Sequence, residues 1–89
     1  MEEEIYMNID LRGYEDSKII EAKGKHYFKA FRDSKGETSE MIISLITQLV
    51  IVDGQKMTRQ MIDDTPLDEI SYLTEVISTM MNKKYTDGI

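Results

Sequence analysis

The strongest pattern along the chain is a helical stripe of apolar residues between Thr38 and Val52. The apolar positions repeat with the spacing i, i+1, i+4, i+5, which places them on one face of a helix. They are Met41, Ile42, Leu45, Ile46, Leu49 and Val50. We expect Thr38 to be the N-cap, Glu40 to suit the first turn, and Asp53-Gly54 to end this helix. A stripe this wide must be covered by the rest of the chain.

The first third of the chain has the period of two that is typical of β-strands. Ile5, Met7, Ile9 and Leu11 alternate with polar residues, which predicts a strand with one buried face. The β-branched segment Lys18–Ala22 predicts a second strand, and Lys23-Gly24 a tight turn after it.

The segment His26–Phe31 is rich in aromatic residues and predicts a third strand. In a strand, Phe28 and Ala30 share one face, while Tyr27 and Phe31 share the other. Since both faces carry aromatic side chains, we expect this strand to be central or covered on both sides.

The last third of the chain predicts two more helices. Thr58 is a suitable N-cap for a short helix that runs through Ile62. Thr65 is the expected N-cap of a longer helix, with Pro66 at its first position and Asp68 completing a capping box. Apolar residues then recur at helical spacing at Leu67, Ile70, Leu73, Val76, Ile77, Met80 and Met81.

These elements predict one α+β domain over residues 1–89, with loose ends at 1–4 and 85–89. The expected architecture is a small antiparallel three-stranded N-terminal sheet packed against two main amphipathic helices and one short helix. A chain of this length has a small core, and without cysteine it has no disulfide to stabilise that core. We therefore expect a homo-oligomer, or a protein that docks on a partner.

The net charge of −6 argues against a surface that binds nucleic acid through its phosphates. No apolar run is long enough for a membrane span or a secretory signal, so we expect no membrane contact and a cytoplasmic location. The negative charge also fits a second function, that of a small acidic inhibitor that occupies a basic site.

The sequence predicts no catalytic residue, no metal site and no cofactor. His26 is the only histidine and has no nucleophile or base that the sequence pairs with it, which favours a structural role. Asp63, Asp64, Asp68 and Glu69 form an acidic cluster, but their spacing suits a helix N-terminus better than a calcium loop. We therefore expect a protein that is not an enzyme.

Seven methionines is a high number for this length, and most of them fall in the helical half. Methionine is flexible and polarisable, so it recurs both in cores and on surfaces that adapt to partners. Adjacent helix positions point about 100° apart, so under a cover of three helices we do not expect both Met80 and Met81 to be fully buried. The candidate partner-binding residues are Met57, Met61, Met80 and Met81.

The segment from Ile42 to Met81 resembles the small tail assembly chaperones of contractile-tailed phages, the E/41/14 group. In that pattern Ile42–Val50 corresponds to the first helix, Lys56–Ile62 to the connector, and Leu67–Met81 to the last amphipathic helix. The N-terminal half departs from the family, which often has prolines around its strands, whereas this chain has only Pro66. The resemblance implies a protein that coats a tape-measure protein during virion tail assembly and is absent from the finished particle.

Two functions therefore follow from the sequence. The first is a phage tail assembly chaperone, which binds another protein in the host bacterial cytoplasm. The alternative is a small acidic phage-encoded inhibitor of a host defence system, which occupies a basic site or sequesters a small molecule. The gene's neighbourhood would separate the two, because a chaperone gene would lie beside a tape-measure gene.

Overall fold

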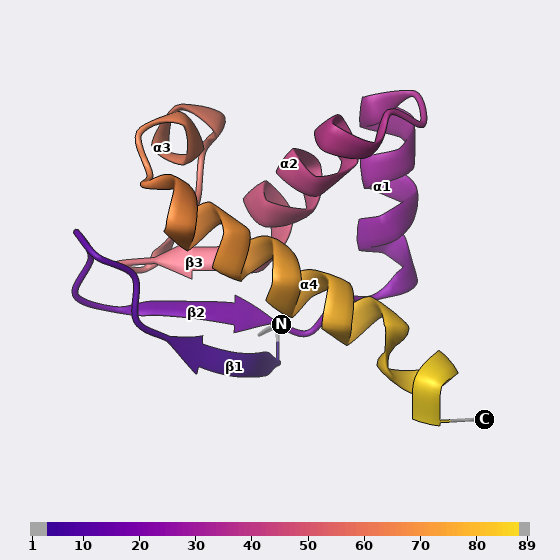
Figure 1. The fold of residues 1–89 in the computed structure, drawn as a ribbon, viewed down its shortest axis with the longest axis horizontal. Coiled ribbons are helices and arrows are strands. Elements are labelled where there is room, and N and C mark those ends of the chain that lie inside the picture. Colours follow the sequence, from indigo (N-terminus) through magenta and orange to yellow (C-terminus); the bar gives the residue numbers. More distant parts are fainter. Residues whose placement is uncertain (1–3, 88–89) are drawn as a thin grey trace.

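The structure is a computed structural model that describes residues 4–87, and the side chains of residues 4–82. Within these residues it is an α+β fold of one four-stranded sheet and four helices (Figure 1). The elements in order are β1 (Ile5–Ile9), β2 (Ser17–Ile20), α1 (Gly24–Ser34), α2 (Thr38–Leu49), β3 (Val50–Val52), β4 (Gln55–Lys56), α3 (Arg59–Asp63) and α4 (Leu67–Asp87).

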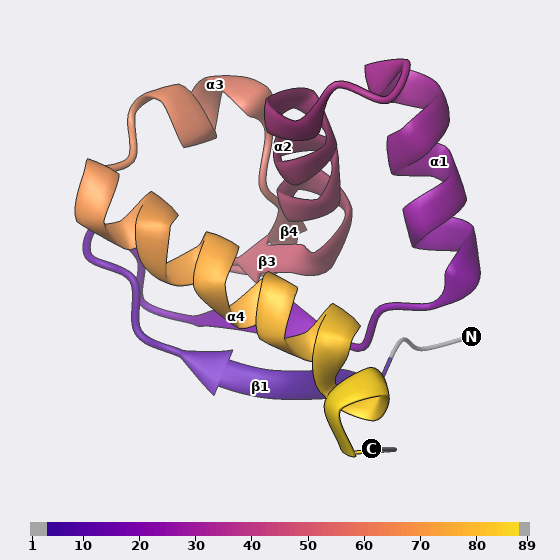
Figure 2. The same ribbon diagram turned by 45° about the vertical axis from the view of Figure 1, so that its right-hand side comes forward.

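The sheet is antiparallel, with the strands in the order β1-β2-β3-β4. It lies along one side of the molecule, and α4 runs diagonally along it (Figure 2). α2 packs against both α1 and α4 and leads directly into β3. The core combines the predicted apolar face of α2 with residues from the sheet and α4, and its members include Leu45, Ile46, Leu49, Val52, Ile19, Leu73 and Ile77.

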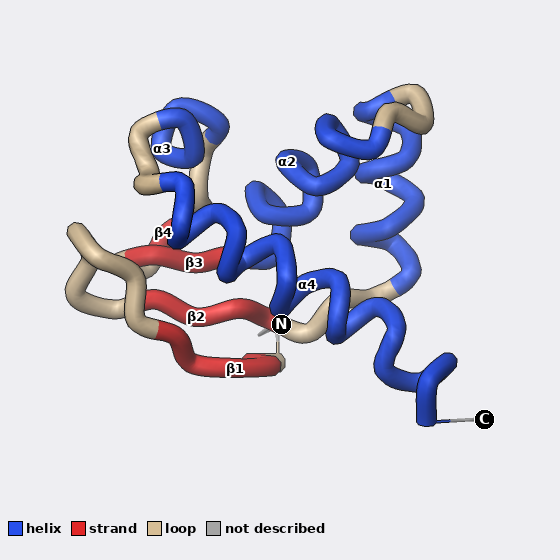
Figure 3. Tube along the Cα trace, viewed as in Figure 1, coloured by secondary structure: helices blue, strands red, loops and turns tan. Residues whose placement is uncertain are grey.

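The predicted three-stranded N-terminal sheet is wrong, because its third strand is a helix. The segment His26–Phe31 lies within α1 (Figure 3). Along α1 the buried residues are His26, Ala30 and Ser34, which are spaced four apart and face α2. Phe28 therefore points away from Ala30 instead of sharing a face with it. The small Ala30 lets α1 pack closely on α2, and the aromatic rings remain at the surface.

The third strand of the sheet comes instead from the end of the predicted apolar helix. α2 ends at Leu49, and Val50–Val52 pairs with β2 as strand β3. Asp53-Gly54 is the turn of the β3–β4 hairpin and not the end of a helix, with positive φ angles of 49° and 85°. Such angles at both positions are typical of a tight hairpin turn, which Asp-Gly favours.

Asp53 also holds the loop that joins β1 to β2. Its Oδ1 accepts hydrogen bonds from the backbone N–H groups of Glu15 and Asp16, at 3.0 and 2.9 Å. Arg12, in the same loop, binds the first turn of α4 through the carboxylates of Asp68 and Glu69. The β1–β2 loop is therefore fixed to both the hairpin and α4.

Strand β1 does not have the fully buried face that its alternation predicts. Ile5 is 51% exposed and Met7 is also exposed, whereas Ile9 is half-buried and Leu11 is buried beyond the end of the strand. β1 is an edge strand, and its register with β2 shifts between Ile5 and Met7. Such a shift re-aims the side chains on either side of it, so the period-two pattern does not predict their burial.

The short third helix confirms the Thr58 cap, because the Thr58 hydroxyl oxygen accepts a hydrogen bond from the Met61 N–H at 3.2 Å. The Thr65 cap is wrong. The Thr65 hydroxyl donates to the Met61 carbonyl at 2.6 Å, so it binds the end of α3 and not the start of α4. The reason is that the turn between the two helices is tight enough to put Thr65 within reach of α3.

α4 begins at Leu67, which is 78% exposed and does not join the buried stripe of that helix. The helix extends through Asp87, so residues 85–87 are helical and not a loose tail. The remaining predicted loose ends, 1–3 and 88–89, lie outside the described residues. Among the residues that the structure describes, no helix is both long and apolar enough to cross a membrane.

Candidate partner-binding groove

An apolar groove lies between the start of α1 and the second half of α4. Its volume is about 410 Å³, and we call it the α1–α4 groove. Leu45 of α2 contributes to its lining beneath the two helices, and the lining residues are Ala22, Lys23, Gly24, Tyr27, Leu45, Met80 and Met81. Lys23 is the one charged side chain among them, so the groove suits an apolar ligand with a polar or acidic edge.

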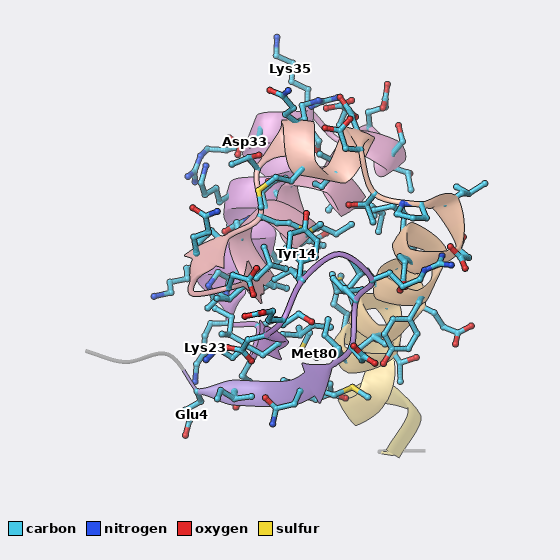
Figure 4. All side chains as sticks on the ribbon, turned by 90° about the vertical axis from the view of Figure 1, so that its left-hand side faces the viewer. Glu4, Tyr14, Lys23, Asp33, Lys35 and Met80 are labelled. Atoms are coloured by element: carbon cyan, nitrogen blue, oxygen red, sulfur yellow. The ribbon has the colours of Figure 1, made fainter. Side chains whose placement is uncertain are left out.

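The α1 wall of the groove is held in place by hydrogen bonds around His26. The Lys23 N–H donates to His26 Nδ1 at 2.8 Å, and Gln48 Nε2 of α2 donates to the His26 carbonyl at 2.9 Å. Lys23 Nζ also lies 3.8 Å from Glu4 Oε1. Figure 4 labels both residues, near the start of β1. These bonds connect the first turn of α1 to α2 and to the start of β1, so the wall is preorganised.

The structure brings together two of the four methionines that the sequence proposes for partner binding. Met80 is half-buried and packs against the core, while Met81 is 43% exposed. Both line the groove, as expected of adjacent helix positions that point about 100° apart. Their flexible side chains would let the groove adapt to the shape of a ligand.

The other two methionines lie elsewhere. Met57 is 1% exposed and belongs to the core, so it offers no surface to a partner. Met61 is half-buried in α3, where its sulfur accepts a hydrogen bond from the Thr58 N–H at 3.3 Å. Neither residue lines the α1–α4 groove.

Sequence reasoning missed the α1 side of the groove, because it placed Tyr27 in a covered strand. The signal was present, since Tyr27, Phe28 and Phe31 have the spacing i, i+1, i+4, which also fits a helix. Lys25, Lys29 and Arg32 recur at helical intervals in the same segment. A six-residue aromatic run was too short for periodicity alone to separate helix from strand.

The two candidate chemical features of the sequence have structural roles. His26 is buried at the start of α1, where its ring accepts the hydrogen bond from the Lys23 N–H. In the acidic cluster, Asp68 and Glu69 bind Arg12, while Asp63 and Asp64 are exposed. Within the described residues, no group of three or more His, Cys, Asp or Glu side chains is placed to hold a metal ion.

A second, smaller hollow of about 220 Å³ is lined by residues of α1, α2 and α3, which are Asp33, Glu40, Ile43, Ser44, Thr47 and Arg59. Its main feature is a two-pronged ion pair in which both terminal nitrogens of Arg59 lie 2.8 Å from the Glu40 carboxylate oxygens. The hydrogen bonds between these two side chains lower the pKa of the Glu40 carboxyl and raise the pKa of the Arg59 guanidinium. This pair connects α3 to α2.

Comparison with known protein families, curated proteins and solved structures finds no match to this chain.

Proposed function

We propose that this protein is a non-enzymatic tail assembly chaperone of a phage, acting in the host bacterial cytoplasm. In this role it holds an apolar helical segment of the tape-measure protein in the α1–α4 groove. The resemblance of residues 42–81 to the E/41/14 group supports the class of function, and the groove supplies the binding surface that such a function requires.

The observation that carries the proposal is the composition of the groove. Met80 and Met81 of α4 and Tyr27 of α1 line the groove, and the buried Leu45 of α2 contributes to its lining. Apolar grooves lined by methionine accept helices of varied sequence, because the thioether side chains repack at little cost. A chaperone that coats a long helical chain must bind many successive segments, so it needs this tolerance.

The test uses isothermal titration calorimetry to measure the binding of a helical fragment of the tape-measure protein from the same phage. The wild-type protein should bind the fragment. Met80→Lys and Met81→Lys should each weaken binding at least about tenfold, since a charged group replaces apolar contact area in the groove. Ser71→Lys is the matched control, because it adds the same charge at an exposed position of α4 outside the groove.

Absence of binding by the wild-type protein, or equal binding by all four proteins, would contradict the chaperone proposal. The inhibitor of a host defence system would then take its place, since it depends on the acidic charge and not on the groove. The far-ultraviolet circular dichroism of each variant shows whether the helices are intact.

A further inference from the structure

The outward face of α1 is unusually apolar for a surface helix. Phe28 is 63% exposed, Phe31 50% and Tyr27 41%. The ring of Tyr27 lies 5.6 Å from that of Phe28 and 6.4 Å from that of Phe31, so the three rings form one continuous patch. Exposed apolar patches of this kind mark interfaces.

The same helix, together with the lysine on either side of it, is strongly basic in an otherwise acidic protein. Residues 23–35 contain five of the chain's eleven lysines and arginines and one of its seventeen acids, which is a net charge of +4 in a chain of −6. Lys29 pairs with Asp33 at 2.8 Å. Lys25, Arg32 and Lys35 make no salt bridge within the part of the chain whose side chains are described. We call Lys25, Tyr27, Phe28, Phe31 and Arg32 the α1 face.

A complementary surface lies where α3 ends and α4 begins. The segment 63–69 contains four acids and no base, and its Leu67 is 78% exposed. Asp63 and Asp64 are exposed, and Tyr72, five residues after Leu67 in α4, is also exposed. We call residues 63–69 the acidic segment. It offers the apolar Leu67 and the exposed carboxylates of Asp63 and Asp64, while Asp68 and Glu69 are paired with Arg12. Leu67 and the two exposed carboxylates complement the aromatic rings and cations of the α1 face.

The two surfaces of one molecule cannot meet. α2 lies between α1 and α3 in both views, with α1 at one end of the molecule and α3 near the other (Figures 1 and 2). A contact between them must therefore join two molecules.

We propose that the α1 face of one copy of this protein docks on the acidic segment of a second copy. Because the two surfaces differ, the contact is head-to-tail, and each added copy presents a new unoccupied surface. The assembly grows as a row or closes as a ring, and it does not stop at a symmetric dimer. Of the α1 face only Tyr27 lines the α1–α4 groove, so variants at Lys25, Phe28 and Arg32 test this association separately from groove binding.

The test reverses the charge of each surface in a separate variant. Light scattering then measures the molar mass of each protein over a range of concentrations. The wild-type protein should exceed its single-chain mass of 10.3 kDa increasingly with concentration, and 1 M salt should reduce the association. The α1 variant, Lys25→Glu with Arg32→Glu, and the segment variant, Asp63→Lys with Asp64→Lys, should each remain single chains. All four positions are exposed, so both variants should fold, which circular dichroism verifies.

The decisive result comes from mixing the two variants. The α1 variant keeps its acidic segment and the segment variant keeps its α1 face, so an equal mixture should associate, whereas each variant alone should not. Phe28→Ala should weaken wild-type association about tenfold, as expected of a central aromatic contact. Glu21→Lys with Glu75→Lys is the control, because it changes the net charge as the segment variant does, at exposed positions outside both surfaces.

Several outcomes would overturn the proposal. A wild-type protein that stays monomeric, a mixture that stays monomeric, or a wild-type dimer that never extends would each exclude head-to-tail docking. A labelled single-stranded oligonucleotide provides a further arm, because exposed aromatic and basic residues also bind such strands. If the monomer binds it and the α1 variant does not, the α1 face is a nucleic-acid surface instead.

Discussion

At the scale of single residues, polar side chains hold the junctions between elements. The Ser17 hydroxyl accepts from the Leu11 N–H at 3.2 Å and donates to the Ile9 carbonyl at 3.1 Å, which satisfies a buried serine. Asp53 binds the β1–β2 loop, and His26 binds the backbone before α1. These roles are structural, because each side chain positions a neighbouring element of the fold.

Thr65 provides a test at this scale. Thr65→Val keeps the shape of the side chain but removes the hydrogen bond to the Met61 carbonyl, so we expect a loss of about 1 kcal/mol of unfolding free energy. Urea denaturation followed by circular dichroism measures it. Thr65→Ser keeps the hydroxyl and should retain most of the stability. A valine variant as stable as the wild-type protein would show that the bond contributes nothing.

At the scale of elements, α1 is the part of the fold on which both functional proposals depend. Its N-terminal turn forms a wall of the α1–α4 groove, and its outward side forms the α1 face. The helix packs on α2 through His26, Ala30 and Ser34, all buried. A strand in this position would have buried Phe28 together with Ala30 and left no aromatic patch.

Two substitutions on α1 distinguish helix from strand. Ala30→Leu should destabilise the protein by about 1–3 kcal/mol, because it forces extra atoms between α1 and α2. Phe28→Ala should change the stability by less than about 0.5 kcal/mol, as expected of an exposed position. Thermal and urea unfolding measure both. If the two substitutions lowered the unfolding free energy equally, positions 28 and 30 would share an environment, as they would in a strand.

The ion pair between α2 and α3 predicts a pH dependence. Arg59 lowers the pKa of Glu40 below its ordinary value of 4.5, so the pair stabilises the folded state above that value. This stabilisation is lost as the pH falls through the lowered pKa. The wild-type protein should therefore exceed Glu40→Gln in stability at neutral pH by a small amount, since both side chains are partly exposed.

The measurement is urea unfolding of both proteins from neutral pH down to the lowest pH at which they fold. The difference between them should be constant above pH 4.5 and shrink below it, and added salt should reduce it. If the difference in unfolding free energy grew as the pH fell, its pH dependence would have the opposite sign to the one expected, and this ion pair would be excluded as its cause.

At the scale of the whole molecule, the two proposed surfaces adjoin at Tyr27. Tyr27 lines the α1–α4 groove and also contacts the rings of Phe28 and Phe31. A partner segment in the groove and a second copy on the α1 face would therefore lie side by side. A row of copies joined head to tail would present a series of grooves, which suits a long helical ligand.

This arrangement predicts different effects for two neighbouring aromatic residues. Tyr27→Ala should weaken both the binding of the tape-measure fragment and self-association, because its ring belongs to both surfaces. Phe28→Ala should weaken self-association alone, because Phe28 does not line the groove. Calorimetry with the fragment and light scattering without it measure the two effects. Equal loss of fragment binding in both variants would show that the groove and the α1 face are not separate sites.

Much of the local structure follows from the sequence itself, because nearby residues decide it. The apolar face of α2 follows from spacing alone, and its members Leu45, Ile46 and Leu49 are buried. The Thr58 cap depends on a residue three positions away. The sequence also predicts that Met80 and Met81 are not both fully buried, and Met80 is half-buried while Met81 is 43% exposed.

Other features depend on contacts between residues distant in sequence, so only the tertiary structure decided them. Val50–Val52 continues the helical apolar stripe, yet pairing with β2 makes it a strand. The segment His26–Phe31 is a helix because His26 and Ala30 fit against α2, where large side chains would not. Thr65 binds α3 because the chain turns back there. In each case the deciding partner lies in another element of the fold, so the pattern of neighbouring residues alone does not show it.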